Sequence, residues 1–237
     1  MESTVPELLR RGAVQLLVTR WLSRSKESWT DLPVPAPQQT VSSAGPNPDR
    51  VLLVGSGIAV GYGMDSHEVA LGGQLAKQLT AITGRGAIVD VLVGDHMTVV
   101  SLREALDRAR LQSTDAIVAT PGSVESLIFM PTAQWRGQVV ALLDDIQLRA
   151  PASLHLFFVA IPPIQTLMRM PLLLSLLISS SRRRLNRALA EVCEGREYAT
   201  FVPFEPTEPF GRTGSGRTYA QWAGMLAPAV SRALDAP

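Results

Sequence analysis

The sequence is poor in cysteine, and its single cysteine, Cys193, excludes a disulfide within the chain. A metal site built on several cysteines is excluded for the same reason, and we expect no metal ion and no organic cofactor. Cys193 falls in a helical pattern, where a free thiol usually behaves as a small apolar side chain. We therefore predict that Cys193 is buried and has no chemical role.

Aromatic residues and charge of one sign are also scarce. Aromatics make up 5% of the residues, and the formal net charge is +1. Nucleic-acid-binding proteins usually present a basic surface, often with aromatic rings on which bases stack. Nucleic acid is therefore not an expected partner.

Long apolar runs are missing too. No run reaches the roughly 18–20 residues that a transmembrane helix needs. The apolar run from Ala13 to Val18 is short, Arg20 follows it, and no small-residue cleavage site comes after it, so it does not resemble a signal peptide. We expect a cytoplasmic protein, with a peripheral position at the inner face of the membrane as the alternative.

Residues 1–30 predict an N-terminal amphipathic helix over residues 4–24. Thr4 and Glu7 match a capping box, and Pro6 suits a first helical turn. Apolar residues recur at helical spacing: Leu9, Ala13, Leu16, Leu17 and Trp21. The polar side carries four arginines: Arg10, Arg11, Arg20 and Arg24. Such a helix would dock on the domain or on a second subunit, or it would lie on an anionic membrane.

Residues 31–49 have the composition of a linker, because prolines are closely spaced there. They are Pro33, Pro35, Pro37, Pro46 and Pro48. Residues 50–237 are then predicted to form one domain.

Strand and helix patterns alternate from Arg50 onward. The strand candidates are apolar on both faces, as in a covered parallel sheet: Val51–Val54, Ile88–Val93, Ala116–Ala119, Leu154–Ala160 and Thr200–Val202. The helical patterns cover Ala70–Thr83, Val99–Ala109, Ala133–Arg149, Leu172–Glu194 and about Thr218–Leu234. This alternation predicts a three-layer α/β/α domain with a mainly parallel five-stranded sheet. Sites in such domains lie beyond the carboxyl ends of the strands.

The first strand ends in a glycine-rich turn that permits a nucleotide-binding alternative. Gly55, Gly57 and Gly61 loosely match a dinucleotide fingerprint, but Val60 stands where the fingerprint needs glycine. An acid to bind ribose is expected about 20 residues further on, and Asp95 is much more distant. A Rossmann-like nucleotide-binding protein remains the weaker alternative.

The order of these segments resembles the SGNH/GDSL hydrolases over about residues 50–235. The turn Gly55-Ser56-Gly57-Ile58 is similar to the Gly-Asp-Ser-Ile turn of that family. The strand from Asp115 is followed by Gly122, and Tyr219-Ala220-Gln221-Trp222 lies near the end. The resemblance implies a flavodoxin-like sheet and ester hydrolysis or acyl transfer. It also implies a serine nucleophile after the first strand, oxyanion donors from later loops and an Asp-x-x-His near the C-terminus.

The positions that carry this chemistry differ here. Gly57 takes the place of the nucleophilic serine, and Ser56 the place of the preceding aspartate. His96 falls at the oxyanion glycine, Val124 at the oxyanion asparagine and Thr213 at the histidine. Glycine has no hydroxyl group, and a valine side chain cannot donate a hydrogen bond to an oxyanion. The resemblance therefore implies a pseudo-hydrolase with a binding or scaffold role, for an acyl or lipid ligand, a second copy or a related active subunit.

An active esterase or acyltransferase with rewired residues is the alternative. Ser56 and His96 would form the nucleophile and base, with Glu125 or Asp95 as the group that orients the imidazole. The other two histidines, His67 and His155, are expected to be structural.

One apolar stretch, from Ile164 to Ile178, is rich in leucine and methionine and is followed by Arg182-Arg183-Arg184. It is interpreted as a buried connection with arginines on a solvated turn. The alternatives are an acyl-chain groove, a partner interface and a membrane contact with the arginines at the headgroups.

Overall fold

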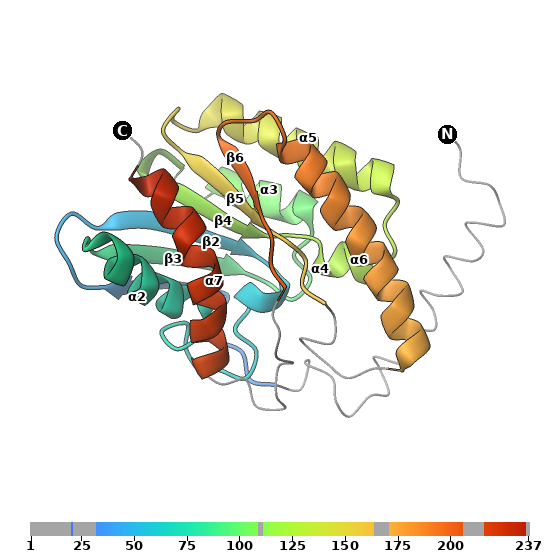
Figure 1. The fold of residues 1–237 in the computed structure, drawn as a ribbon, viewed down its shortest axis with the longest axis horizontal. Helices are drawn as coiled ribbons and strands as arrows, with labels where there is room; N and C mark the ends of the chain where they lie inside the picture. The colour runs from blue at the N-terminus through green and yellow to red at the C-terminus, as the bar shows by residue number, and fades with distance from the viewer. Residues whose placement is uncertain (1–19, 21–31, 109–110, 164–170, 206–215, 236–237) are drawn as a thin grey trace.

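The computed structural model describes residue 20 and residues 32–108, 111–163, 171–205 and 216–235. The predicted N-terminal helix therefore lies outside the described residues, except for Arg20. The described residues from 32 onward form a six-stranded sheet between two layers of helices (Figure 1), which confirms the three-layer α/β/α fold.

The sheet is mainly parallel, in the order β1-β3-β2-β4-β5-β6. Its strands are β1 (Gln38–Ser43), β2 (Asp49–Gly55), β3 (Ala87–Val93), β4 (Ala116–Thr120), β5 (His155–Val159) and β6 (Ala199–Val202). Only β1 is antiparallel to its neighbour, β3. Gly55, the last residue of β2, pairs with Val93 of β3 and Thr120 of β4, so these strands end side by side.

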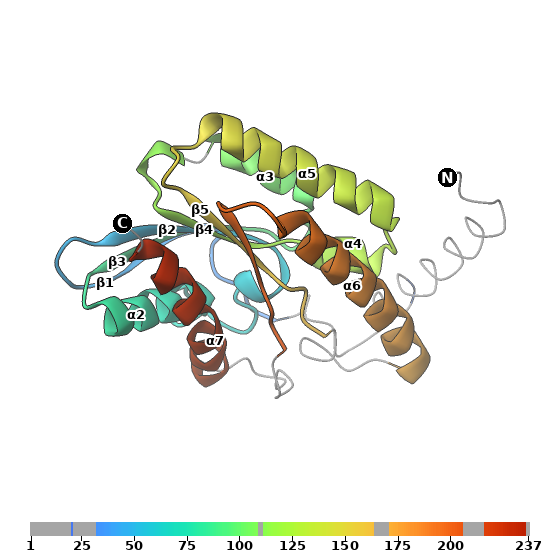
Figure 2. The same ribbon diagram turned by 45° about the horizontal axis from the view of Figure 1, so that its top comes forward.

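Helices cover both faces of the sheet (Figures 1 and 2). One layer contains α2 (Leu71–Thr83) and α7 (Gly216–Leu234). The other contains α3 (Val99–Arg108), α5 (Thr132–Arg149) and α6 (Leu172–Cys193). Short helical segments lie between these strands and helices along the chain: η2 (Gly57–Ala59), η3 (Leu111–Ser113) and α4 (Ser123–Leu127). Within the described ranges, no helix is long and apolar enough to cross a membrane.

The central strand β2 is apolar on both faces because each face is covered by a separate core. In β2, Val51 and Leu53 pack against the layer of α2 and α7, while Leu52 and Val54 pack against the opposite layer. All four are buried. This double burial explains why β2, and likewise β4 and β5, show no alternation of polar and apolar residues, whereas β3 alternates and leaves Asp90 exposed.

The sixth strand comes from the segment predicted as a linker. Residues 38–43 form β1 at the edge of the sheet, with prolines before and after it, and only Val41 among them is fully buried. An edge strand with a polar sequence gives almost no hydrophobic signal, so the proline spacing dominated the prediction. The linker composition is therefore confined to the residues around β1.

The chain before β1 is held to the domain by His67, which is fully buried. The Nε2 atom of His67 lies 3.1 Å from the carbonyl oxygen of Ala36. The backbone N–H of His67 donates to Oε1 of Gln39, and the backbone N–H of Gly63 donates to the carbonyl of Pro33. His67 is thus structural, as expected, and burial lowers its pKa.

Candidate functional site

A small cavity lies at the carboxyl ends of the strands, where the fold predicts the site. Its volume is ≈ 30 Å³, and one water molecule needs roughly 10–15 Å³ by this measure. Its lining includes Gly57, Tyr62, Asp95, Ser123, Val124 and Arg182. These residues come from β2, β3, β4 and α6 or from the segments that follow them, so the topology brings distant parts of the sequence together.

The glycine-rich turn after β2 is fixed to β4. The backbone N–H of Ser56 donates to the carbonyl of Thr120 at 3.1 Å, and the Thr120 hydroxyl donates to the carbonyl of Ser56 at 2.9 Å. A Cβ at Gly55 would lie 2.6 Å from the Thr120 carbonyl oxygen, so only glycine permits this approach. Ser56 itself is fully buried, and its Oγ has no hydrogen-bond partner among the described residues.

Gly57, at the position of the family's nucleophile, faces Ser123. Gly57 has a φ of 64°, a conformation that residues with side chains rarely adopt. A Cβ placed on Gly57 would lie 2.4 Å from the Oγ of Ser123, the residue that begins α4. The Ser123 hydroxyl therefore fills the space in which a nucleophile on residue 57 would have to begin.

Ser123 was missed by the sequence analysis, which aligned Val124 with the oxyanion asparagine. Both residues line the cavity, but it is Ser123 that contacts the Gly57 position. A shift of one residue in that alignment, with Gly122 as its fixed point, would have identified Ser123. Gly122 has a φ of 96° and turns the chain from β4 into α4.

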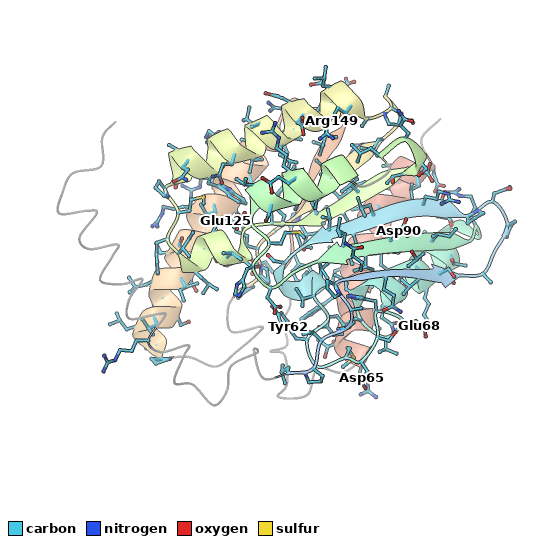
Figure 3. The ribbon with its side chains drawn as sticks, turned by 180° about the vertical axis from the view of Figure 1, so that it is seen from behind. Tyr62, Asp65, Glu68, Asp90, Glu125 and Arg149 are labelled. Atoms are coloured by element: carbon cyan, nitrogen blue, oxygen red, sulfur yellow. The ribbon has the colours of Figure 1, made fainter. Side chains whose placement is uncertain are left out.

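Glu125 is hydrogen-bonded to the beginning of α3. Its side chain is fully buried, and its Oε1 accepts a hydrogen bond of 2.6 Å from the backbone N–H of Val99, the first residue of α3. Its Oε2 has no partner among the described residues. Burial raises the pKa of the Glu125 carboxyl, and the hydrogen bond from Val99 opposes this rise only in part. Figure 3 shows Glu125 between the helical layer and the ends of the strands.

Asp95 follows β3 and interacts with Tyr62, not with an imidazole. Tyr62 is almost fully buried, and its hydroxyl hydrogen-bonds to the Asp95 side chain. Burial first and the neighbouring Asp95 second raise the pKa of Tyr62. A further hydrogen bond, from the Tyr219 hydroxyl to the Tyr62 carbonyl at 3.1 Å, ties this corner to α7.

The proposed pair of Ser56 and His96 is not assembled in this structure. His96 is exposed on the loop after β3, whereas Ser56 is fully buried and its Oγ makes no hydrogen bond to a described residue. Thr213, aligned with the family's histidine, lies outside the described residues. His155, at the beginning of β5, pairs with the Thr200 hydroxyl at 2.8 Å and stacks on Phe157, so it is structural as expected.

Arg182 is a second cavity residue that the sequence analysis missed. It was grouped with Arg183 and Arg184 on a solvated turn, but only those two are exposed. The Arg182 guanidinium donates through Nη1 to the Ile161 carbonyl at 3.1 Å and to Glu205 at 2.9 Å. Its Nε has no partner among the described residues. The helical spacing from Ile178 to Arg182, which puts both on the inner face of α6, was the available signal.

The described residues contain no group of three or more histidine, cysteine, aspartate or glutamate side chains arranged to hold a metal ion. Cys193 is buried, as predicted, and burial raises its pKa to about 11. A larger hollow of ≈ 380 Å³ lies on the face of β1 and β3 that carries Asp90 (Figure 3). Arg50 and Thr40 also line it, and it does not include the glycine-rich turn.

Comparisons by sequence find no matching protein-family model and no matching curated protein. Comparisons by structure find many solved structures with the same fold. The lipase Lip_vut3 from a goat rumen metagenome has a TM-score of 0.60 at 12% identity, over 76% of this chain and 97% of that chain. An inhibitor-bound aryl esterase of M. smegmatis has a TM-score of 0.58 at 15% identity, over 78% and 99%.

A putative lipolytic protein of the G-D-S-L family from Desulfitobacterium hafniense DCB-2 is also similar, with a TM-score of 0.55 at 12% identity. The match covers 78% of this chain and 98% of that chain. Identities this low establish a shared fold and carry no residue roles. The chain therefore has the fold of the SGNH/GDSL esterases and lipases.

Proposed function

We propose that the chain is an SGNH-fold protein that has lost ester hydrolysis and acts by binding or as a scaffold. The observation that carries this proposal is the close approach of the Ser123 hydroxyl to the position where residue 57 would have its side chain. A serine at position 57 would need a left-handed backbone, and its Cβ would lie 2.4 Å from the present position of the Ser123 hydroxyl, which would have to rotate away. The backbone conformation and the position of Ser123 therefore both favour glycine at position 57, which supports the proposal.

The surroundings of the described hydroxyl groups also support a loss of hydrolysis. A serine becomes a nucleophile when a base such as histidine lies within hydrogen-bond reach. Ser56 is buried without a partner among the described residues, and the exposed His96 makes no hydrogen bond to any of them. An active esterase built from these two residues would require both of them to move.

An acyl or lipid ligand fits the proposal only in part. A cavity of ≈ 30 Å³ accepts a small polar head and has no room for an acyl chain or a nucleotide. Arg182 would offer positive charge to a carboxylate or phosphate head, in competition with Glu205. A second copy of this chain or a related active subunit is the other partner that the proposal includes.

The test is hydrolysis of nitrophenyl esters with short and medium acyl chains by the full-length protein. We expect no turnover above the buffer rate, and no labelling by a fluorophosphonate probe that reacts with activated serines. The variants Ser56→Ala and Ser123→Ala serve as matched controls. Turnover that is abolished by either variant would overturn the proposal and identify the serine responsible.

A second experiment places a serine hydroxyl at position 57. The variant Gly57→Ser should remain inactive, because no imidazole of a described residue is hydrogen-bonded at this turn. A gain of esterase activity in this variant would mean that the base is intact, and the loss of function would then rest on one residue.

A further inference from the structure

The first turns of α6 carry apolar side chains that nothing in the described structure covers. Leu172 is 74% exposed, Leu173 is 69% exposed and Leu176 is 56% exposed. Figures 1 and 2 show this end of α6 extending past the end of the sheet. Leucines on a helix that packs on a sheet are normally buried, so three exposed together indicate a contact surface.

The same exposed side of α6 continues into a basic stretch. Arg183, Arg184 and Arg187 are exposed, and none of them forms an ion pair with a described residue. Among the residues that the structure describes, their one hydrogen bond joins Arg184 to the hydroxyl of Ser180, on the same helix. The acid on the next turn, Glu191, is already paired with Arg136 of α5. The surface therefore presents uncompensated positive charge next to exposed leucines.

We propose that this surface of α6 docks on an anionic membrane. Leu172, Leu173 and Leu176 insert among the acyl chains, and Arg183, Arg184 and Arg187 bind the phosphates of the headgroups. Stable docking of a peripheral protein needs two such signals, an apolar insertion and attraction to anionic lipid. The proposal goes beyond the loss of hydrolysis and does not depend on it.

The spacing along the helix fits the layers of a bilayer. Leu173 and Arg184 are separated by about 16 Å along the axis, at 1.5 Å per residue. A helix that tilts its first turns into the membrane would bury the leucines by roughly 5–10 Å. The arginines would then stand at the depth of the headgroups, where they meet negative charge.

A second copy of the chain explains the surface less well. A stable dimer buries about 800 Å² on each partner, and three leucine side chains cannot supply such an area. The neighbouring residues on this side of α6 are arginines, which favour an anionic partner over a further apolar one. The location of the exposed leucines also agrees with an anionic membrane as the partner. The helix α6 runs antiparallel to the parallel strands, so its first turns lie at the same end of the sheet as the cavity.

The experiment is flotation of the full-length protein with vesicles of phosphatidylcholine, with or without about 30 mol% phosphatidylserine. We expect binding to the anionic vesicles only, and weaker binding as salt is raised because the headgroup attraction is screened. Leu173→Ser should weaken binding by roughly tenfold through the loss of apolar burial. Arg183→Gln should weaken it by about fivefold, the effect of one surface charge.

Matched variants on other surfaces provide the controls. Leu148 on α5 is 85% exposed, and Leu148→Ser should leave binding unchanged. Lys77 is exposed on α2, and Lys77→Gln should also have no effect. No binding to anionic vesicles would overturn the proposal, as would equal losses in the control variants.

Two further outcomes would assign the surface differently. Arg10→Gln with Arg11→Gln tests the predicted N-terminal helix in the full chain. Binding that is lost in this variant and unaffected by Leu173→Ser would overturn the α6 proposal in favour of residues 4–24. A dimer in analytical ultracentrifugation that Leu173→Ser dissociates would show that a second copy covers the leucines.

Discussion

Gly57 and Ser123 lie in close contact at the glycine-rich turn. The backbone of Gly57 has a φ of 64°, and the Ser123 hydroxyl lies where its side chain would begin. A residue with a Cβ loses about 1–2 kcal/mol in this conformation before any collision is counted. This local packing makes the glycine a structural requirement of the present site and not a neutral replacement.

Gly57→Ala is therefore expected to lower the free energy of unfolding by at least about 1–2 kcal/mol. The collision with Ser123 adds to this loss, although its hydroxyl can rotate away. When Ser123 is also replaced by alanine, the loss of stability caused by Gly57→Ala should fall towards the cost of the left-handed backbone alone. Urea denaturation of the natural protein, the two single variants and the double variant gives the coupling free energy between the two positions. Equal penalties in the two backgrounds would mean that Ser123 does not restrict position 57.

Glu125 makes the stability of the protein depend on pH in a specific direction. Burial raises its folded-state pKa above the ordinary value of 4.5, so the folded state holds the proton more tightly than the unfolded state. Stability is then fully present below about pH 4.5 and is lost as the pH rises through the raised pKa.

Glu125→Gln should remove this pH dependence while keeping the acceptor for the Val99 N–H. The free energy of unfolding of the variant, relative to the natural protein, should increase as the pH rises from 4.5. Glu104→Gln, an exposed change on α3, is the control and should show no such trend. A flat difference for Glu125→Gln across this range would mean that its carboxyl is not perturbed.

Among single residues, the sequence identified Gly57 but did not identify two other residues that line the cavity. Gly57 was recognised because it interrupts a motif of fixed spacing. Ser123 was not, because one residue of shift at the beginning of a short helix decides which side chain faces the turn. Arg182 was hidden within a run of three arginines, and only its place on the inner face of α6 separates it from its neighbours.

At the scale of elements, one side chain joins α6 to the end of β5. The Asn186 side chain accepts a hydrogen bond from the backbone N–H of Ile161 at 2.9 Å and donates one to its carbonyl at 3.0 Å. Arg182, one turn earlier, donates to the same carbonyl. Ile161 in turn packs so closely on Gly122 that a Cβ there would lie 2.4 Å from it. Asn186 thus positions one wall of the cavity.

Asn186→Ala should lower the free energy of unfolding by about 1–3 kcal/mol, the cost of leaving the Ile161 N–H unpaired, while the Ile161 carbonyl keeps its bond from Arg182. The change can be measured by urea denaturation monitored through the tryptophan signal. Arg187→Ala on the exposed side of the same helix should stay within about 0.5 kcal/mol of the natural protein. If the two variants were equally stable, the bonds between Asn186 and Ile161 would contribute nothing.

Elements with a continuous apolar pattern were predictable, and β1 was not. The five predicted strands and the five long helices lie within two residues of their predicted limits, because their apolar residues are mostly buried and burial dictates their composition. Only Val41 of β1 is fully buried, and the strand is held largely by backbone pairing with β3. Backbone pairing leaves no trace in a single sequence, so an edge strand between prolines looks like a linker.

For the whole molecule, the order of strands and helices was enough to predict the three layers and the end of the sheet that carries the site. Right-handed crossovers and covered parallel strands leave few alternatives for such a sequence. The contents of the site were harder to predict, since they depend on how loops after β2, β3 and β4 meet. The apolar stretch before Arg182 was assigned to several alternatives because composition alone does not reveal which leucines are covered.

The antiparallel direction of β1 has a practical consequence for handling the protein. Its first residue, Gln38, pairs with Leu92 near the carboxyl end of β3, so the chain enters the fold beside the cavity. The last described residue, Asp235, is paired with Arg85, which also holds Asp49 at the opposite end of the sheet. An affinity tag or surface tether fused after the C-terminus would therefore leave the cavity and the tip of α6 accessible.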